Sequence, residues 1–288
     1  MHPKTIGLIA HPGKPGVGEL INSLSAEFSR RSMSILLEKE TAAVAGQRSA
    51  LTIAEVATKA DLLVVAGGDG TILSVADQMG EANTPIFGIN VGSLGFLTCA
   101  GSQTFRDAVE CIASGKITFS NRTLLEVILR DSKEKHAPMI ALNDAVVSRG
   151  ELSRLIRLHT RVNGEALTEF NADGLIIATP TGSTAYSLSA GGPIMEPESG
   201  VFVITPICPH VLTNRSIIVS ENSVIEVEVS EPDYPVYLTV DGREPLRIAK
   251  DAKVEIRKAK KKLQLAAMPN VSFFSVVRQK LKWSGSNV

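Results

Sequence analysis

The sequence lacks an excess of charge of either sign. Its 288 residues carry 30 Lys and Arg against 30 Asp and Glu, so the formal net charge is zero. A neutral chain generates no global field that would attract nucleic acid or an anionic membrane surface. We therefore expect neither nucleic acid nor membrane among its partners, and any partner has to be inferred from local sites.

Cysteines and long apolar runs are also scarce. The three cysteines, Cys99, Cys111 and Cys208, form no CxxC pair and are odd in number. This argues against a disulfide framework or a structural zinc site and is typical of a reducing compartment. The apolar run near the N-terminus stops at His11 and Pro12, too early for a signal peptide. No run approaches the roughly 18 residues of a membrane span, so we expect a cytoplasmic protein.

Two kinds of catalytic site are missing as well. The five histidines form no HExxH motif and no other ligand pair, so no dedicated transition-metal site is expected. No GxSxG motif is present to hold a nucleophilic serine for acyl transfer. Any metal would arrive bound to a phosphate group. The remaining composition, 44% hydrophobic and 21% charged, is typical of a globular protein of about two domains.

The first 120 residues alternate short apolar runs with amphipathic stretches, which predicts βαβ units and a mainly parallel sheet. The predicted strands are Ile6–Ala10, Ser34–Leu37, Leu62–Ala66 and Pro85–Asn90, and the predicted helices are Glu19–Arg31 and Phe105–Ile112. We therefore expect an N-terminal α/β, Rossmann-like domain over residues 1–120.

From Asn121 onward, runs of β-branched residues dominate and predict a second, β-rich domain over residues 121–269. One helix is expected within it, from about Gly182 to Ala190. A C-terminal helix within residues 270–288 is expected to pack back on the first domain. The basic cluster Arg257–Lys262 predicts a solvated hairpin between two strands rather than a polyanion site.

The sharpest local feature is a glycine-rich turn, Gly67-Gly-Asp-Gly-Thr71, that joins a buried strand to a helical pattern. Such junctions bind ligands, because glycines admit a phosphate close to the backbone and the helix offers unpaired N–H groups. Asp69 is unusual there, because phosphates repel a carboxylate unless it contacts a hydroxyl or a bridging cation. The structural alternative is a tight turn with Asp69 as helix N-cap, and the motif alone leaves both open.

A second junction favours the ligand interpretation. The segment Phe87–Leu97 again leads from a strand through spaced glycines, and Phe96 is apolar enough to lie on a base. Phe96 and Leu97 are equally suited to filling core.

The β-rich half carries the longest motif, Asp173–Pro193. Its buried strand ends in Thr-Pro-Thr-Gly and opens a helix rich in hydroxyl groups, which suits a sugar and a phosphate. Thr181 or Ser183 as a helix cap is the alternative. Upstream, Asn143-Asp144 lies among apolar runs, where polar side chains need partners, so hydroxyl recognition or an Asx turn is expected.

Taken in order and spacing, these motifs resemble the NAD kinase family over nearly the whole chain. The Gly-Gly-Asp-Gly-Thr loop is shared with diacylglycerol and sphingosine kinases and echoed in phosphofructokinases, whereas Thr-Pro-Thr-Gly-Ser-Thr-Ala-Tyr186 looks specific to NAD kinases. The resemblance implies an N-terminal α/β domain, a C-terminal β-sandwich-like domain, and a homo-oligomer, a tetramer or a dimer. It also implies phosphoryl transfer from ATP or polyphosphate, with Mg²⁺, to the 2′-hydroxyl of the adenosine ribose of NAD.

The resemblance also implies roles for individual residues. Asp69 is the expected proton acceptor, with Gly70 beside it and Phe96 beside the adenine. Asn143 and Asp144 match the pair that contacts ribose and base, and Asp173 matches the acid near the nicotinamide. The segment expected around the adenosine comprises Thr184, Ala185, Tyr186, Ser187, Leu188 and Ser189.

Three further positions correspond by spacing but differ in residue type. Arg154 and Arg243 stand where relatives often carry histidine and glutamine, and each suits a phosphate contact or a surface ion pair equally. Asn171 stands at a position that varies within the family, and this variation accompanies tolerance of NADH and the choice of phosphoryl donor. The range of donors and acceptors that this chain accepts therefore stays open. Cys99 near the second junction is expected to pack rather than tune the site.

Two other functions are weighed against the NAD kinase. A lipid kinase of the same superfamily would share only the Gly67–Thr71 loop and would need an apolar groove. A dinucleotide sensor without catalysis would need no acid at position 69.

Overall fold

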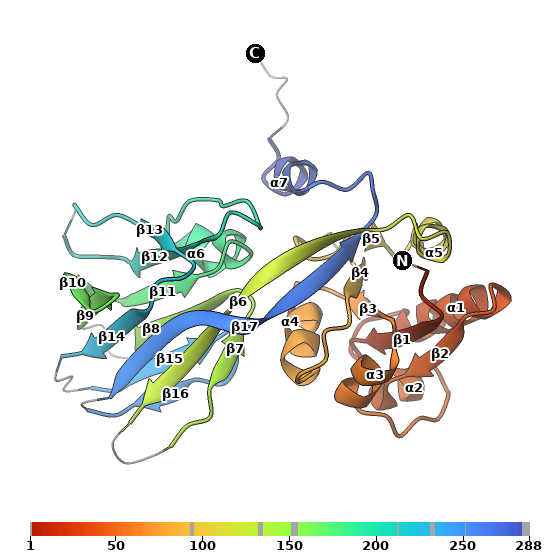
Figure 1. Ribbon diagram of the computed structural model, residues 1–288, viewed down its shortest axis with the longest axis horizontal. Helices are drawn as coiled ribbons and strands as arrows, with labels where there is room; N and C mark the ends of the chain where they lie inside the picture. Colours follow the sequence, from red (N-terminus) through yellow and green to blue (C-terminus); the bar gives the residue numbers. More distant parts are fainter. Residues whose placement is uncertain are drawn as a thin grey trace. The chain divides into compact units, whose positions relative to one another are not determined.

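The computed structural model describes residues 2–92, 95–131, 135–150, 155–211, 213–230, 234–250 and 252–283 (Figure 1). The chain folds into two compact units. Unit 1 comprises residues 1–121 and 263–288, and unit 2 comprises residues 122–262. Two long strands, β6 (Thr118–Arg130) and β17 (Lys253–Ala267), contribute residues to both units.

Unit 1 is built on a parallel sheet in the order β2-β1-β3-β4. Its strands are β1 (Thr5–Ala10), β2 (Ser34–Leu37), β3 (Leu62–Gly67) and β4 (Ile86–Asn90). The short strand β5 (Ala100–Gly101) and the end of β17 also pair with β4. Strands β3 and β4 are buried throughout, which explains why they read as continuous apolar runs.

Helices cover both faces of this sheet. Helices α1 (Val17–Arg30) and α5 (Phe105–Ala113) share one core cluster with Ile6 and Leu8 of β1. On the opposite face lie α3 (Ile53–Lys59) and α4 (Asp69–Gln78). Gly7 permits the close approach of α3, because a Cβ there would lie 2.5 Å from Val56 Cγ1. Two more helices complete the unit, α2 (Lys39–Val44) and α7 (Phe273–Lys280).

Unit 2 consists of two sheets. The first has the order β10-β9-β14-β17-β6-β7, and the second has the antiparallel order β13-β12-β11-β8-β15-β16. The strands of the first, besides β6 and β17, are β7 (Met139–Ala141), β9 (Ile156–Val162), β10 (Glu165–Ala172) and β14 (Ile225–Val229). Those of the second are β8 (Asp144–Arg149), β11 (Gly174–Ala178), β12 (Val201–Ile207), β13 (Ile217–Ser220), β15 (Val236–Val240) and β16 (Leu246–Ile248).

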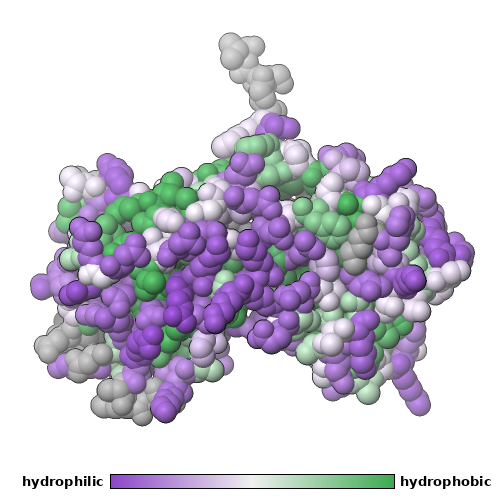
Figure 2. All heavy atoms as spheres, viewed as in Figure 1, coloured by the Kyte–Doolittle hydropathy of each residue, from purple (hydrophilic) through white to green (hydrophobic). Residues whose placement is uncertain are grey.

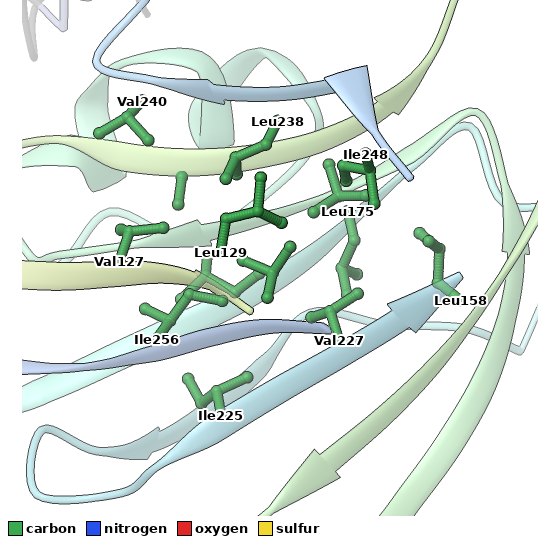
Figure 3. Packing of buried hydrophobic residues seen from close by; sticks show 14 of the residues in the cluster. Val127, Leu129, Leu158, Leu175, Ile225, Val227, Leu238, Val240, Ile248 and Ile256 are labelled. Carbon is green, nitrogen blue, oxygen red and sulfur yellow. The ribbon is translucent and has the colours of Figure 1, made fainter. Parts of the chain in front are cut away.

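The core of unit 2 lies between its two sheets. Figure 3 shows Val127, Val227 and Ile256 of the first sheet on one side of this core, with Leu238 and Val240 of the second sheet on the other. Alternate residues of each strand point inward, so burying them fixes the strand register. The predicted combination of an α/β region and a β-sandwich-like region is confirmed.

Two sequence predictions about local structure need correction. The hairpin predicted around the basic cluster is wrong, because β17 continues unbroken from Lys253 to Ala267. Buried Ala259 and Leu263 keep the cluster within one alternating strand, and Lys258 pairs with Glu221. The helix expected from Gly182 to Ala190 is divided into the 3₁₀ turn η1 (Gly182–Thr184) and the short helix α6 (Tyr186–Ser189). Among the helices that the structure describes, none is long and apolar enough to span a membrane.

Candidate active site

The glycine-rich loop of unit 1 lies between the end of β3 and the start of α4. Gly67 is required by packing, because a Cβ there would lie 2.2 Å from Thr71 Oγ1. That hydroxyl accepts a hydrogen bond from the Gly68 amide at 3.2 Å. Gly68 and Gly70 face open space instead, with no atom within 4 Å of an added Cβ. The loop therefore keeps its backbone accessible at the first turn of α4.

Asp69 joins the two glycine-rich junctions. Its Oδ2 accepts from the Phe96 amide at 2.8 Å and its Oδ1 from the Leu97 amide at 3.0 Å. Gly95 makes this approach possible, because a Cβ there would lie 1.9 Å from Asp69 Oδ1. A carboxylate offers about four lone-pair sites, so the partly exposed Asp69 keeps acceptor capacity beyond these two bonds.

Phe96, expected beside a base, is half-buried. The Lys280 Nζ atom of α7 lies 5.8 Å from the centre of its ring, within cation–π range. One interaction of this ring is therefore already made inside unit 1.

A cavity of about 760 Å³ opens beside the loop of unit 1. Its volume is within the range of nucleotide-sized ligand pockets. Gly68, Gly70 and Thr71 form one part of the lining, at the carboxyl ends of parallel strands, where ligands bind in α/β sheets. The rest of the lining comes from the end of β1 and the segment after it, from the start of α2, from the start of α3 and from α4: Ile9, Ala10, His11, Pro12, Lys14, Glu38, Lys39, Glu40, Thr52, Ile53, Ser74, Val75 and Gln78.

The charged side chains that line this cavity differ in whether protein hydrogen bonds already occupy them. Glu38 is buried, and its carboxylate accepts from the Glu40 and Thr41 amides and from Thr41 Oγ1, each at 2.9 Å. Lys14 and Lys39 also line the cavity. These residues were not predicted from the sequence, although each follows a predicted strand within a few positions, Lys14 after β1 and Glu38 and Lys39 after β2.

In unit 2 the structure brings the Asn143-Asp144 turn and the Thr-Pro-Thr-Gly segment together. The Thr179 amide donates to the Asn143 carbonyl at 2.9 Å, and Thr179 Oγ1 donates to the Leu142 carbonyl at 2.6 Å. Gly182 packs on the same turn, where a Cβ would lie 2.1 Å from the Asn143 carbonyl oxygen. The two motifs that the sequence suggested separately form one surface.

Asp144 is buried in this surface, at 5% exposure. Burial, with the nearby charge of Asp241 as the second cause, raises the pKa of Asp144 to about 7. Asp241 was not predicted from the sequence, yet its carboxylate accepts from the amides of residues 142–144 at 2.7, 2.8 and 3.1 Å.

The hydroxyl-rich segment serves its own fold in part. Ser183 Oγ donates to the Pro180 carbonyl at 2.6 Å and accepts from the Met195 amide at 2.9 Å. Ser187 is buried and shares a hydrogen bond with Thr205 at 3.0 Å. Tyr186, by contrast, is 47% exposed. Ser189 is also exposed, and the half-buried positions are Thr184, Ala185 and Leu188.

The remaining predicted residues of unit 2 have different surroundings. Asp173 forms an ion pair with Arg149, with Nε and Oδ1 2.7 Å apart, and this hydrogen bond raises the pKa of Arg149. Arg243 donates from Nε to the Val240 carbonyl at 3.1 Å and from Nη2 to the Ile140 carbonyl. Asn171 is half-buried in β10, and Arg154 lies outside the described residues.

Clusters of three or more His, Cys, Asp or Glu side chains able to hold a metal are absent from the described residues. Cys99 is buried and donates weakly to the Gly88 and Ala266 carbonyls, and burial raises the pKa of its thiol to about 12. Its environment is that of a packed residue rather than a reactive one.

Sequence comparison finds matches over most of the chain. Residues 6–117 match the family model of the ATP-NAD kinase N-terminal domain, and residues 142–268 match that of the ATP-NAD kinase C-terminal domain. An NAD kinase from Solibacter usitatus is 41% identical over 280 residues, covering 97% of this chain and 98% of its own length. An NAD kinase from Geobacter sulfurreducens is 39% identical over 280 residues, covering 97% and 99%.

Solved structures match along the whole length. The crystal structure of yeast NADH kinase complexed with NADH has a TM-score of 0.89 at 26% identity, covering 100% of this chain and 90% of that one. The crystal structure of an NAD kinase from Archaeoglobus fulgidus in complex with ATP has a TM-score of 0.77 at 24% identity, covering 98% and 100%. The second likeness supports the fold alone.

Proposed function

This chain belongs to the NAD kinase family, and from that premise we propose that it transfers the terminal phosphoryl group of ATP or polyphosphate to the 2′-hydroxyl of the adenosine ribose of NAD. The same comparisons favour this function over a lipid kinase or a non-catalytic sensor. The observation that supports the proposal most is the junction at Asp69, which joins both glycine-rich loops next to a nucleotide-sized cavity.

The phosphoryl donor is proposed to bind in the cavity of unit 1. Its phosphates would lie against Gly68, Gly70 and Thr71, where backbone N–H groups and the positive end of the α4 dipole attract an anion. Lys14 and Lys39 would add positive charge to the same cavity. Comparing ATP and polyphosphate as substrates would identify the phosphoryl donor.

Mg²⁺ is expected on the donor's phosphates, where it would reduce their charge. Asp69 fits this arrangement, because the two hydrogen bonds that it accepts from backbone amides leave acceptor sites for a cation bound to the phosphates. Glu38 does not fit that role, because its oxygens already accept three hydrogen bonds.

Asp69 is proposed as the proton acceptor for the ribose hydroxyl. In a loose phosphoryl-transfer transition state the proton leaves late, so a weak base suffices when it is well positioned. The Phe96 and Leu97 amides hold the carboxylate in position. Phe96 itself is proposed to lie beside the adenine.

The acceptor dinucleotide is proposed to contact unit 2. Asn143 and Asp144 would bind ribose and base, and Asp173 would lie near the nicotinamide end. The exposed Tyr186 and Ser189 are available to a ligand, whereas Ser187 would act by holding the segment. The other proposed contacts are Thr184, Ala185, Leu188, Asn171, Arg154 and Arg243.

A homo-oligomer and a cytoplasmic location are also proposed. Figure 2 shows apolar surface over β12 and β13. Ile218 of β13 is 53% exposed, and Val211, between the two strands in sequence, is 46% exposed. Exposed apolar surface of this kind favours contact with a second copy. The three cysteines are all free, which suits a reducing compartment.

The test is NADP formation from NAD and Mg²⁺ with either ATP or polyphosphate, using wild type and Asp69→Asn. The variant should lose about 10²- to 10⁴-fold in kcat, the usual contribution of a positioned proton acceptor. Asp61→Asn is the matched control, because Asp61 accepts from the Lys4 and Thr5 amides at 2.8 and 2.9 Å, before β3 rather than after it. Binding of NAD without product would contradict the proposed function, and unchanged turnover in Asp69→Asn would contradict the role of Asp69.

A further inference from the structure

The loop between β15 and β16 begins with Asp241, which packs against the turn that carries Asn143 and Asp144. Asp241 directly follows β15 and has a φ of 50°, and Gly242 after it has a φ of 68°. Few residues with a side chain adopt a left-handed backbone, and Asp is among those that tolerate it. The Asp241 amide donates to the Asp144 carbonyl at 3.0 Å, which continues the pairing of β15 with β8.

This backbone conformation places the Asp241 carboxylate among three consecutive amides. Oδ2 accepts from Leu142 at 2.7 Å, and Oδ1 accepts from Asn143 at 2.8 Å and from Asp144 at 3.1 Å. Successive N–H groups that converge on one point form an anion-binding nest, here filled by a side chain of the same unit. Hydrogen bonds to an ionised group are stronger than neutral ones, so the turn is held firmly.

The side chains of the same turn are placed differently. Neither the Asn143 amide group nor the Asp144 carboxyl group forms a hydrogen bond with any residue that the structure describes. Asp144 is nevertheless buried, and buried polar groups in folded proteins normally have partners. The turn thus has a fully occupied backbone and two polar side chains left for a ligand.

We propose that Asp241 is a positioning residue for the dinucleotide, because its carboxylate fixes the turn of residues 142–144 so that Asn143 and Asp144 face the ribose and the base. This inference rests on the proposed function. Asp241 acts through the turn and has no contact of its own with the substrate.

The test is Asp241→Asn in steady-state kinetics. Asparagine has one acceptor oxygen and an NH₂ group, and the NH₂ group would face at least one of the three amide donors. The turn should loosen, and the KM for NAD should rise about 10- to 100-fold, as expected for lost hydrogen bonds to a charged group. The kcat at saturating NAD and the KM for ATP should change by less than about twofold, because the interactions lost are binding interactions.

Asp61→Asn provides the matched control. It removes a carboxylate that also accepts from consecutive backbone amides, but in unit 1 and at the Lys4-Thr5 segment. Both variants should lose thermal stability to a similar degree. Only Asp241→Asn should raise the KM for NAD, which separates positioning from a general effect on folding.

Hydrogen–deuterium exchange of the amides of residues 142–144 gives a readout that does not depend on activity. Faster exchange together with a higher KM for NAD would support the proposal. Faster exchange with unchanged KM, or a fall in kcat at unchanged KM, would overturn it. If Asp241→Asn fails to fold, Asp241→Glu keeps the charge on a longer side chain and should raise the KM for NAD by a smaller factor.

The wild type separates this proposal from the proposed function. If it binds NAD but forms no NADP, the function fails, and calorimetric titration of NAD into Asp241→Asn still tests the positioning role by the loss of affinity. If the wild type forms NADP and the variant has an unchanged KM, only the positioning role fails.

Discussion

The two units use the same device to fix a ligand-facing loop, but they leave the carboxylate in different states. In unit 1, Asp69 follows β3 and Gly68 and accepts from two amides of the loop after β4. In unit 2, Asp241 follows β15 and accepts from the amides of residues 142–144, where the chain enters β8. Each aspartate connects segments that are distant in sequence and adjacent in space.

The difference lies in what remains available on each carboxylate. Asp69 accepts two hydrogen bonds from backbone amides and is partly exposed, and Gly95 packs against one side of its carboxylate. Its remaining acceptor sites can take a hydrogen bond from a hydroxyl group or contact a cation. Asp241 accepts three hydrogen bonds from backbone amides. These bonds hold residues 142–144 in place, and the proposed ligand contacts are made by Asn143 and Asp144 rather than by Asp241. The number of acceptor sites that backbone amides occupy therefore distinguishes the carboxylate proposed for chemistry, Asp69, from the one proposed for positioning, Asp241.

Among the substitutions of residues that pack on these loops, Gly95→Ala should have the largest effect on turnover, and it tests the role of Asp69. The new Cβ would lie 1.9 Å from Asp69 Oδ1, so the carboxylate must move while keeping its charge. A displacement of about 1 Å at a catalytic group can cost about 10²-fold, so we expect kcat to fall about 10- to 100-fold. Stopped assays of NADP formation at saturating substrates measure it.

Gly101→Ala is the control for that variant, because its Cβ would have one ordinary contact, 3.9 Å from Thr104 Oγ1. Its kcat should match that of the wild type. A Gly95→Ala enzyme with full kcat would show that the position of Asp69 does not matter to turnover.

Gly182→Ala makes the corresponding change in unit 2. Its Cβ would lie 2.1 Å from the Asn143 carbonyl oxygen, a backbone atom that cannot rotate away. We expect the free energy of unfolding to fall by about 1–3 kcal/mol, as for other overpacked sites. The KM for NAD should rise about tenfold, as expected for about 1.4 kcal/mol of lost binding. Denaturant titration and kinetics measure the two effects, and an unchanged KM for NAD would remove the turn from the dinucleotide site.

Lys14→Ala sharpens the assignment of the donor to unit 1. Losing one cation from the cavity should raise the KM for ATP about three- to tenfold, with less effect at high salt, and leave the KM for NAD unchanged. Lys59→Ala, in the last turn of α3 and outside the cavity lining, is the matched control. A higher KM for NAD in Lys14→Ala would instead indicate that this cavity binds the acceptor, NAD.

The smallest effect expected is on the pH dependence of stability. Burial raises the pKa of Asp144 to about 7 from an ordinary 3.8. The folded state therefore holds this proton more tightly than the unfolded state, and stability falls as pH rises from about 4 to about 7. Asp144→Asn lacks this dependence, so the wild-type Tm should decline by several degrees more than the variant's across that range. Parallel melting curves would contradict the buried, uncompensated state of Asp144.

The regular strands of unit 1 and the glycine-rich junctions could be predicted because they follow from local patterns. The apolar runs of β3 and β4 and the glycines beside them are contiguous in sequence. The pairing of β9 with β10 also has a local signal, since Asn163 and Gly164 between them both have a positive φ, as in a tight hairpin turn. The predicted hairpin at the basic cluster failed because tertiary pairing continues β17 through its lysines.

The supporting residues of the site could not be predicted in this way. Asp241 lies 97 to 99 residues from the amides that it holds, and Arg149 lies 24 residues from Asp173. Such contacts depend on sheet topology rather than on spacing along the chain. The cavity proposed for the phosphoryl donor similarly combines segments at the ends of two parallel strands with the first turn of α4.

The most direct test of the two roles compares Asp69→Asn and Asp241→Asn in one titration of NAD at saturating ATP, with NADP as product. We predict that Asp241→Asn recovers nearly the wild-type rate once NAD is saturating, whereas Asp69→Asn stays slow at every NAD concentration. Recovery of Asp69→Asn by NAD, or failure of Asp241→Asn to recover, would contradict the division between a catalytic and a positioning carboxylate.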